Sequence, residues 1–280
     1  MFKAAVSFLI CIAALASCQF QAGNEEAMAA NGRPMRIVSL DYCADQYVLA
    51  LVDREQILAL SPDSQKSFSF LKDKAKGIRQ VRPNAEDILA MQPDLVVLSY
   101  GGGPKAADFF KRAGVPVAQV GWANDLSAVR SVLEDMSAAL AAEERGRALL
   151  DDFDRRLAKI EPQATPRTVM YLTAGGVTSG SGTLIDEMFR AAGLLNFETS
   201  TGWRSIPLER LAVEQPDIVA PAFFSADTLS QNGWSAARHP VAMRQLQQKP
   251  VVELDSAWTS CGAWFLINGI EALANAEMSP

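Results

Sequence analysis

Short apolar runs alternate with amphipathic segments along the first half of the chain. The runs read as strand candidates at Arg36–Leu40, Ile57–Leu60, Asp94–Leu98 and Pro116–Val120. Continuous apolar runs are typical of parallel strands that are buried on both faces. Helical patterns lie between them, at Asp45–Leu51, at Ala85–Met91 and through Phe109 to Gly114. Strand and helix in alternation predict an α/β unit with a parallel sheet.

The second half repeats this alternation. Strands are expected at Thr168–Leu172, Asp217–Ala220 and Pro250–Leu254. Helices are expected at Leu184–Ala191, Leu208–Val213, His239–Gln247 and Ala263–Ala274. The pattern therefore predicts a second α/β unit.

The segment between the halves, Leu126–Ile160, has a helical composition. It contains no proline and one glycine, Gly146, and strong helix formers fill the rest. One apolar stripe recurs at helical spacing through Leu149, Phe153, Leu157 and Ile160. A helix from Glu143 to Ile160 would be about 27 Å long, which is enough to brace two units together.

The N-terminus carries the features of an export signal. Lys3 precedes an uncharged apolar run, Ala4–Leu15, that is shorter than the roughly 20 residues of a membrane-spanning helix. Residues 15–18 resemble the bacterial lipobox, which predicts a signal peptide over 1–17 and lipid attachment at Cys18. The alternative is ordinary cleavage after Ala16, which leaves a soluble protein with a free thiol. Both alternatives place the mature chain outside the cytoplasm, and residues 18–34 are polar enough to form a flexible tether.

Composition narrows the possible functions. The net charge of -6 and the absence of Lys/Arg clusters argue against a nucleic-acid partner. The chain is 49% hydrophobic, which allows full cores in two domains. The one histidine, His239, disfavours a site for bare zinc or manganese, because such sites gather several histidines. No nucleophile elbow, phosphate-binding loop or zinc-protease motif occurs, so an enzyme is disfavoured too.

The two halves also share a motif. Glu86 and the Gln-Pro-Asp sequence before the strand at Asp94–Leu98 correspond, at identical spacing, to Glu209 and the sequence before Asp217–Ala220. Packing alone accounts for most of the apolar matches. A carboxylate in the first turn of each helix is not required by packing, although the helix dipole favours one there.

The order of these motifs resembles the helical-backbone class of solute-binding proteins of ABC importers, which serve ferric siderophores, cobalamin and haem. The resemblance covers Arg36 to Leu273. Its motifs are RIVSL at Arg36–Leu40, AEDILAMQPDLVV at Ala85–Val97, the helix through Glu143–Ile160, GTLIDEMFRAAG at Gly182–Gly193 and LERLAVEQPDIV at Leu208–Val219.

The resemblance implies the class III periplasmic binding protein fold, an α/β fold with two Rossmann-like lobes whose parallel sheets are joined by one long α-helix. Here it implies an N-terminal lobe over 35–124, a linking helical segment over 125–163 and a C-terminal lobe over 164–280. It further implies a monomer in the periplasm with no resident cofactor and no catalysis. A metal chelate would bind between the lobes, and Glu86 and Glu209 would dock onto an ABC permease. The alternatives are a chelatase-like enzyme of similar architecture and a protein that binds a free transition metal.

Candidate ligand contacts follow from sheet geometry, because ligands of open α/β sheets bind outside the carboxyl ends of the strands. The residues expected there are Tyr42, Tyr100, Gly101, Trp122, Phe223 and Trp258. Flat apolar side chains suit a bulky chelate. Arg79 and Arg82 either hold an anionic chelate or are solvated surface residues.

Two cysteines, Cys43 and Cys261, follow the first and last expected strands at their cleft ends. In the architecture that the resemblance implies, both could lie near the junction of the lobes. A disulfide between them would limit opening of the lobes. The alternatives are two free buried thiols and ligands for a soft metal.

Overall fold

The computed structural model describes residues 32–161, 165, 167–222 and 235–276. The expected signal peptide, Cys18, most of the tether and Phe223 lie outside these residues. Over the described ranges, no helix combines the length and the apolarity that crossing a membrane requires.

The first lobe is built on a parallel four-stranded sheet with the order β2-β1-β3-β4. Its strands are β1 (Ile37–Ser39), β2 (Ile57–Ala59), β3 (Leu95–Leu98) and β4 (Val117–Gln119). Its helices are α1 (Tyr42–Leu51), the short 3-10 helix Arg54–Gln56, α2 (Ala85–Ala90) and α3 (Ala106–Arg112). Every position of the central strands β1 and β3 is buried, as their continuous apolar sequences predict.

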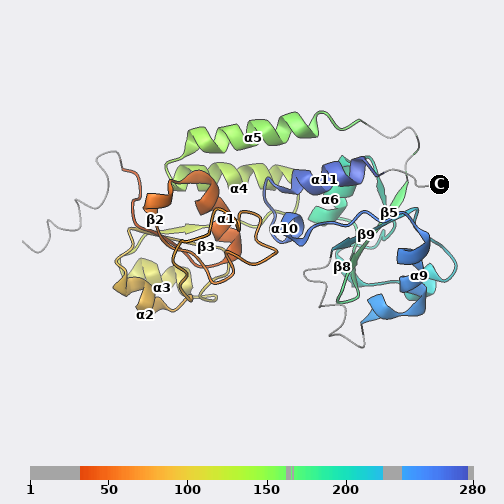
Figure 1. The fold of residues 1–280 in the computed structure, drawn as a ribbon, viewed down its shortest axis with the longest axis horizontal. Coiled ribbons are helices and arrows are strands. Elements are labelled where there is room, and N and C mark those ends of the chain that lie inside the picture. The colour runs from red at the N-terminus through yellow and green to blue at the C-terminus, as the bar shows by residue number, and fades with distance from the viewer. Residues whose placement is uncertain (1–31, 162–164, 166, 223–234, 277–280) are drawn as a thin grey trace, which may run out of the picture.

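The second lobe contains a parallel sheet with the order β7-β5-β9 and a separate antiparallel pair, β6-β8. The strands are β5 (Thr168–Thr173), β6 (Val177–Ser179), β7 (Leu195–Asn196), β8 (Trp203–Ser205) and β9 (Ile218–Ala222). The helices are α6 (Leu184–Ala191), α7 (Leu208–Leu211), the 3-10 helix Ala236–Arg238, α9 (Pro240–Gln248), α10 (Ser256–Thr259) and α11 (Leu266–Ala274). Figure 1 shows the two lobes at opposite ends of the molecule.

The strand expected at Pro250–Leu254 is irregular. Its segment lies parallel to β9, with one isolated bridge between Val219 and Val251. The N–H of Val219 donates to the carbonyl of Pro250, but the next position of β9 that faces this segment is Pro221, which has no N–H. The ladder therefore loses a hydrogen bond and no regular strand forms.

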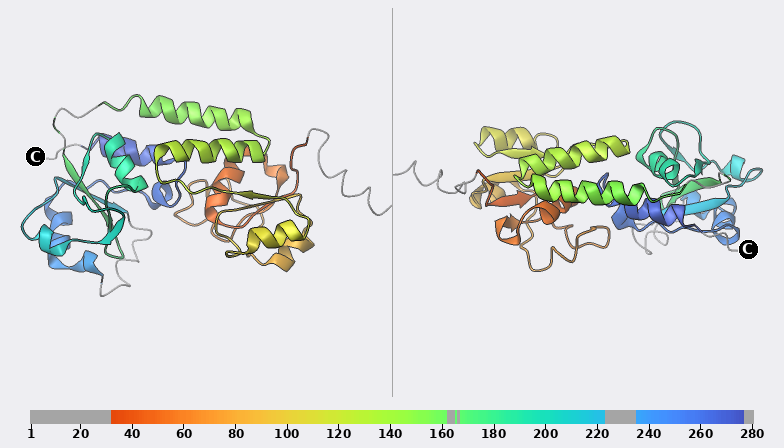
Figure 2. Two further views of the ribbon diagram at one scale, coloured as in Figure 1. Left: turned by 180° about the vertical axis from the view of Figure 1, so that it is seen from behind. Right: turned by 90° about the horizontal axis from the view of Figure 1, so that it is seen from above.

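Two antiparallel helices, α4 (Leu126–Ala139) and α5 (Glu143–Leu157), form the linking segment. They lie side by side along one edge of the molecule, and α5 leads from the first lobe towards the second (Figures 1 and 2). The break between them includes Ala141, whose φ is 50°. The helices approach closely at Gly146, where an added Cβ would lie 1.8 Å from Oγ of Ser137. With 15 residues, α5 is shorter than the predicted helix to Ile160.

The segment between α10 and α11 packs against the first lobe. Cys43 of α1 and Cys261, just after α10, form a disulfide with their Cα atoms 5.8 Å apart. The rings of Phe70 and Phe265 stack with their centroids 4.5 Å apart, and Tyr47 meets Trp264 edge to face at 5.3 Å. One continuous set of buried apolar residues therefore extends from α1 to α11.

This disulfide should contribute strongly to stability. Cys43 and Cys261 are separated by 218 positions, so the bond restricts a very long loop of the unfolded chain. In urea unfolding, the variant Cys43→Ser/Cys261→Ser should lose about 2–5 kcal/mol of unfolding free energy relative to the oxidised protein. Reductant should lower the stability of the wild type to that of the variant and leave the variant unchanged. Equal stability of oxidised wild type and variant would refute a stabilising crosslink.

Candidate functional site

A cavity of about 630 Å³ lies between the two lobes. Its first wall consists of residues that follow β1, β3 and β4, and its second consists of β5, β8 and the start of α6. Residues 259–262, which contain the disulfide cysteine Cys261, complete it. The cavity thus forms where the carboxyl ends of the strands predict a ligand site.

Three of the predicted aromatic residues line the first wall: Tyr42, Tyr100 and Trp122. The rings of Tyr42 and Tyr100 meet edge to face with centroids 5.9 Å apart. Tyr100 is 55% exposed and Trp122 is 82% exposed, so both offer ring surface to a bound molecule. The indole N–H of Trp122 donates to the side-chain oxygen of Asn124 at 2.5 Å.

The buried carboxylate of Asp41 holds this wall in place. Its Oδ2 accepts hydrogen bonds from the backbone N–H groups of Ser99, Tyr100 and Gly101 at 2.7, 3.1 and 2.9 Å. Its Oδ1 accepts from the N–H of Ala44 at 3.0 Å and so caps the start of α1. One side chain therefore fixes both the loop after β3 and the helix after β1.

Gly101 allows the loop after β3 to lie close to the backbone at the end of β1. It is buried, and an added Cβ would lie 2.5 Å from the carbonyl oxygen of Leu40. It is not among the residues that line the cavity. The structure therefore gives it a backbone role next to the site in place of the predicted ligand contact.

The second wall carries Tyr171 of β5 and Trp203 of β8, whose rings meet edge to face at 5.8 Å. Trp203 is 57% exposed. Neither residue was predicted from the sequence. Trp203 lies on a short antiparallel strand in which all three residues are exposed, so no alternation of apolar and polar residues indicates a strand there. The one feature of the sequence that could have indicated this residue was an isolated tryptophan after Gly202.

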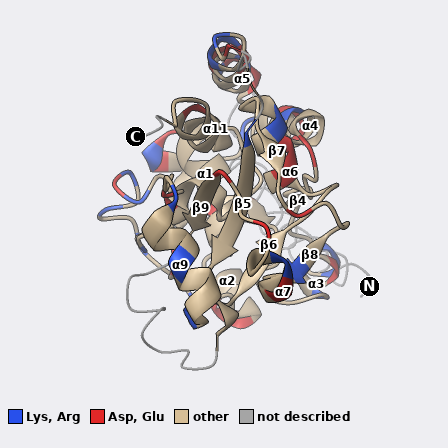
Figure 3. Ribbon diagram, turned by 90° about the vertical axis from the view of Figure 1, so that its right-hand side faces the viewer, with Lys and Arg blue, Asp and Glu red and all other residues tan. Residues whose placement is uncertain are grey.

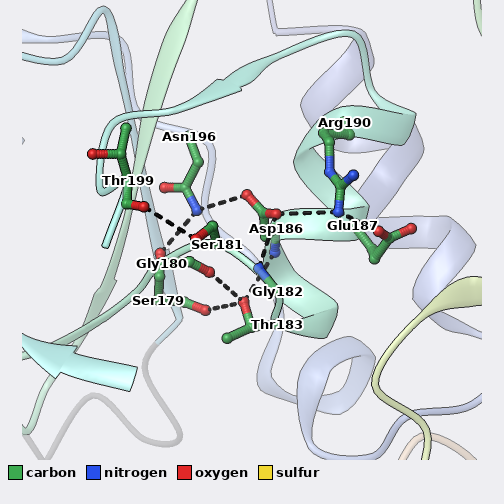
Figure 4. Close-up of polar contacts among 10 residues, drawn as sticks. All are labelled: Ser179, Gly180, Ser181, Gly182, Thr183, Asp186, Glu187, Arg190, Asn196 and Thr199. Atoms are coloured by element: carbon green, nitrogen blue, oxygen red, sulfur yellow. Dashed lines mark hydrogen bonds and ion pairs between the residues drawn. The ribbon is translucent and has the colours of Figure 1, made fainter. Parts of the chain in front are cut away.

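Hydroxyl and amide groups fix the start of α6 at the same wall (Figure 4). The Thr183 hydroxyl caps the helix by accepting from the N–H of Asp186 at 3.2 Å and donates to the carbonyl of Gly180 at 2.9 Å. It also lies 2.6 Å from the hydroxyl of Ser179. The amide of Asn196 donates to the carbonyl of Ser179 and to Oδ1 of Asp186, both at 3.0 Å. These bonds hold the loop after β6 as part of the wall.

All four tyrosines of the cavity are protonated at neutral pH. Burial raises the pKa of Tyr42, Tyr47 and Tyr100 above that of a free phenol, and it raises the pKa of Tyr171 to about 12. The Tyr42 hydroxyl donates to the carbonyl of Ser260 at 2.9 Å, which joins the two walls. The Tyr47 hydroxyl is buried and has no hydrogen-bond partner among the described residues.

The other predicted ligand contacts lie elsewhere. Trp258 is half-buried against Gly269 of α11 and does not line the cavity. Arg79 lines a different hollow, with Asp87 and Met91, and Arg82 is an exposed surface residue. Gln80, between the two arginines, bridges to Leu60, so this segment extends the outer edge of the first sheet. Of the two alternatives for these arginines, the structure therefore favours solvated surface residues over contacts with a ligand in this cavity.

The two glutamates of the shared motif occupy equivalent positions. Glu86 is in the first turn of α2 and Glu209 is in the first turn of α7, and both are exposed. Each lobe therefore presents one carboxylate at the start of a short helix.

The chain is similar to a known protein family and to several solved structures. Residues 37–222 match the family model described as periplasmic binding protein. No curated protein matches the chain.

Several solved structures share the fold. A periplasmic haem-binding protein from Pseudomonas aeruginosa is 24% identical, with a TM-score of 0.65 over 87% of this chain and 92% of that one. The periplasmic haem-binding protein RhuT from Roseiflexus sp. RS-1 is 21% identical, with a TM-score of 0.67 over 86% and 98%. The periplasmic vitamin B12 binding protein BtuF of Vibrio cholerae is 20% identical, with a TM-score of 0.59 over 87% and 96%.

The unpaired hydroxyl of Tyr47 should reduce stability. A buried polar group without a partner costs free energy, so Tyr47→Phe should stabilise the ligand-free protein by about 1 kcal/mol. Tyr42→Phe is the matched comparison, because it removes a hydroxyl that donates to Ser260. It should destabilise the protein by about 1 kcal/mol. Thermal and urea unfolding measure both variants, and a destabilising Tyr47→Phe change would show that the hydroxyl is satisfied.

Proposed function

The chain belongs to the periplasmic binding protein family, and from this premise we propose that it is the solute-binding component of an ABC importer. It has the class III fold of that family, with two α/β lobes. It captures a metal chelate, namely a ferric siderophore, haem or cobalamin, between the lobes and delivers it to the permease. The observation that carries this proposal is the cavity between the lobes, with exposed aromatic rings on both walls.

The walls suit an intact chelate better than a reaction. Tyr100 and Trp122 face the cavity from one lobe and Trp203 faces it from the other, so a flat or bulky ligand meets rings on both sides. The haem and vitamin B12 that similar proteins bind are ligands of this kind. The hydroxyl of Ser179, at the end of β6, is buried and hydrogen bonded to Thr183, so it is not exposed to a ligand in the cavity.

The proposed lobes are joined firmly. We assign residues 35–124 to the N-terminal lobe, 125–163 to the link and 164–280 to the C-terminal lobe. The helix α5, the disulfide and the Tyr42–Ser260 hydrogen bond all resist separation of the walls. The ligand should therefore enter and leave with little movement of one lobe against the other.

The proposal also includes how the protein docks onto the permease and where in the cell it is located. The exposed Glu86 and Glu209 would dock onto basic residues of the permease, one from each lobe. Residues 1–17 would direct export to the periplasm, and a lipid on Cys18 would tether the protein to a membrane.

Binding without turnover is the first test. Purified protein is titrated with haemin, cyanocobalamin and ferric siderophores, and the bound ligand is identified by native mass spectrometry. Tyr100→Ala/Trp122→Ala should weaken binding of the preferred ligand about tenfold or more, because both rings lose their contact with it. Trp258→Phe, outside the cavity, is the control and should bind normally. Chemical conversion of a ligand, or binding to none of them, would refute the proposal.

Charge reversal tests docking. Glu86→Arg/Glu209→Arg should keep the ligand affinity of the wild type, because neither residue lines the cavity. In a strain without the native gene it should fail to restore uptake of the ligand, since two arginines would repel a basic docking surface. Glu144→Arg, which alters an exposed residue of α5, is the control and should restore uptake. Full uptake with the double variant would contradict docking through these glutamates.

A further inference from the structure

Among the residues that the structure describes, those that line the cavity between the lobes carry no charge. Every described residue that lines it is an aromatic, a hydroxyl-bearing or aliphatic residue, a glycine, the asparagine Asn124 or a cysteine of the disulfide. The protein as a whole is 21% charged, so this composition differs from that of its surface. In Figure 3 charged residues gather on the outer helix α5, whereas β5 and β9 have none.

The nearest charged residues do not line the cavity: the carboxylates of Asp41, Asp45 and Asp63 all act on Tyr100, and each of them is negative. The Asp41 carboxylate is buried and accepts four backbone hydrogen bonds. Arg204 follows Trp203 on β8, and because successive side chains of a strand point to opposite faces, it points away from the wall that Trp203 forms. Arg79 lines its separate hollow.

The polar groups that remain are hydroxyls and one amide. The four tyrosines keep their protons, since burial raises each pKa. Tyr100 is 55% exposed and Tyr42 is half-buried, so these two present uncharged phenol groups at the wall, whereas Tyr47 and Tyr171 are buried behind it. Such groups match the amides and hydroxyls at the periphery of a ligand.

An anionic ligand would lose hydration in this cavity and gain no counter-charge from the described walls. Burial of an unpaired charge costs far more than burial of a polar group that can form hydrogen bonds. We therefore propose that the cavity selects uncharged metal chelates, with neutral amide or hydroxyl groups at their edges, over anionic chelates of similar size. This inference rests on the proposed function and narrows its ligand class.

Two matched pairs of probes test the selection. The first is a neutral ferric trihydroxamate, ferrichrome, against a trianionic ferric tris-catecholate, ferric enterobactin. The second is the dimethyl ester of haemin against haemin itself, which differ in their carboxylates. Equilibrium dialysis, read by the absorbance of each chelate and run with cyanocobalamin as an additional uncharged probe, gives the affinities. In each pair the member without the added negative charge should bind about tenfold more tightly or better.

A substitution that adds a positive charge to the wall tests the proposed selection independently of the probes. Asn124→Arg introduces a cation into the wall, so it should reduce the preference for the less negative member of each pair about tenfold. Gln248→Arg adds the same charge on an exposed position of α9 and should leave the preference unchanged.

The outcomes separate this inference from the function on which it rests. Equal or tighter binding of the anionic member of either pair overturns the inference and leaves the solute-binding function intact. A preference that Asn124→Arg does not change also overturns it. Binding of none of the five probes refutes the proposed function itself.

Discussion

The Asp41 carboxylate is the interaction on which the geometry of the first wall depends. Three consecutive N–H groups after β3 and one at the start of α1 converge on it. Buried N–H groups need acceptors, and a buried carboxylate needs donors, so each requirement satisfies the other. Because Tyr42 directly follows Asp41 and Tyr100 lies in the bound loop, the same bonds bring the two rings into contact.

The second wall is held by hydroxyl and amide groups together with the buried carboxylate of Asp186. Thr183, Ser179 and Asn196 supply hydrogen bonds that hold the loop before α6, and the antiparallel β6-β8 pair places Trp203 beside Tyr171. Both lobes thus present rings at the carboxyl ends of their strands. The carboxylates of Asp41 and Asp186, which help to hold the two walls, are both buried and both accept hydrogen bonds.

Local patterns predicted the buried strands and most of the longer helices, but not the short strands β6, β7 and β8 or the short helix α10. The strand at Asp94–Leu98 and the helix at Leu184–Ala191 were predicted within a residue of β3 and α6. A strand buried on both faces has a continuous apolar sequence, and an amphipathic helix has an apolar stripe at helical spacing, so both can be recognised locally. The aromatic residues of the first wall followed from strand ends once the architecture was assumed. For Cys43 and Cys261 the sequence left three alternatives, of which the structure shows the disulfide.

Features that depend on distant partners were not predictable in this way. The irregular segment at Pro250–Leu254 results from a proline on the neighbouring strand, and the exclusion of Arg79 from the cavity results from its place at a sheet edge. Trp258 is an aromatic residue beyond the carboxyl end of an expected strand, as a ligand contact would be, but its side chain packs on α11. The contact of the segment between α10 and α11 with the first lobe has a consequence for the order of folding. Cys43, Tyr47 and Phe70 lack their partners Cys261, Trp264 and Phe265 until this late segment is present, so the first lobe cannot complete its packing around α1 as an independent unit.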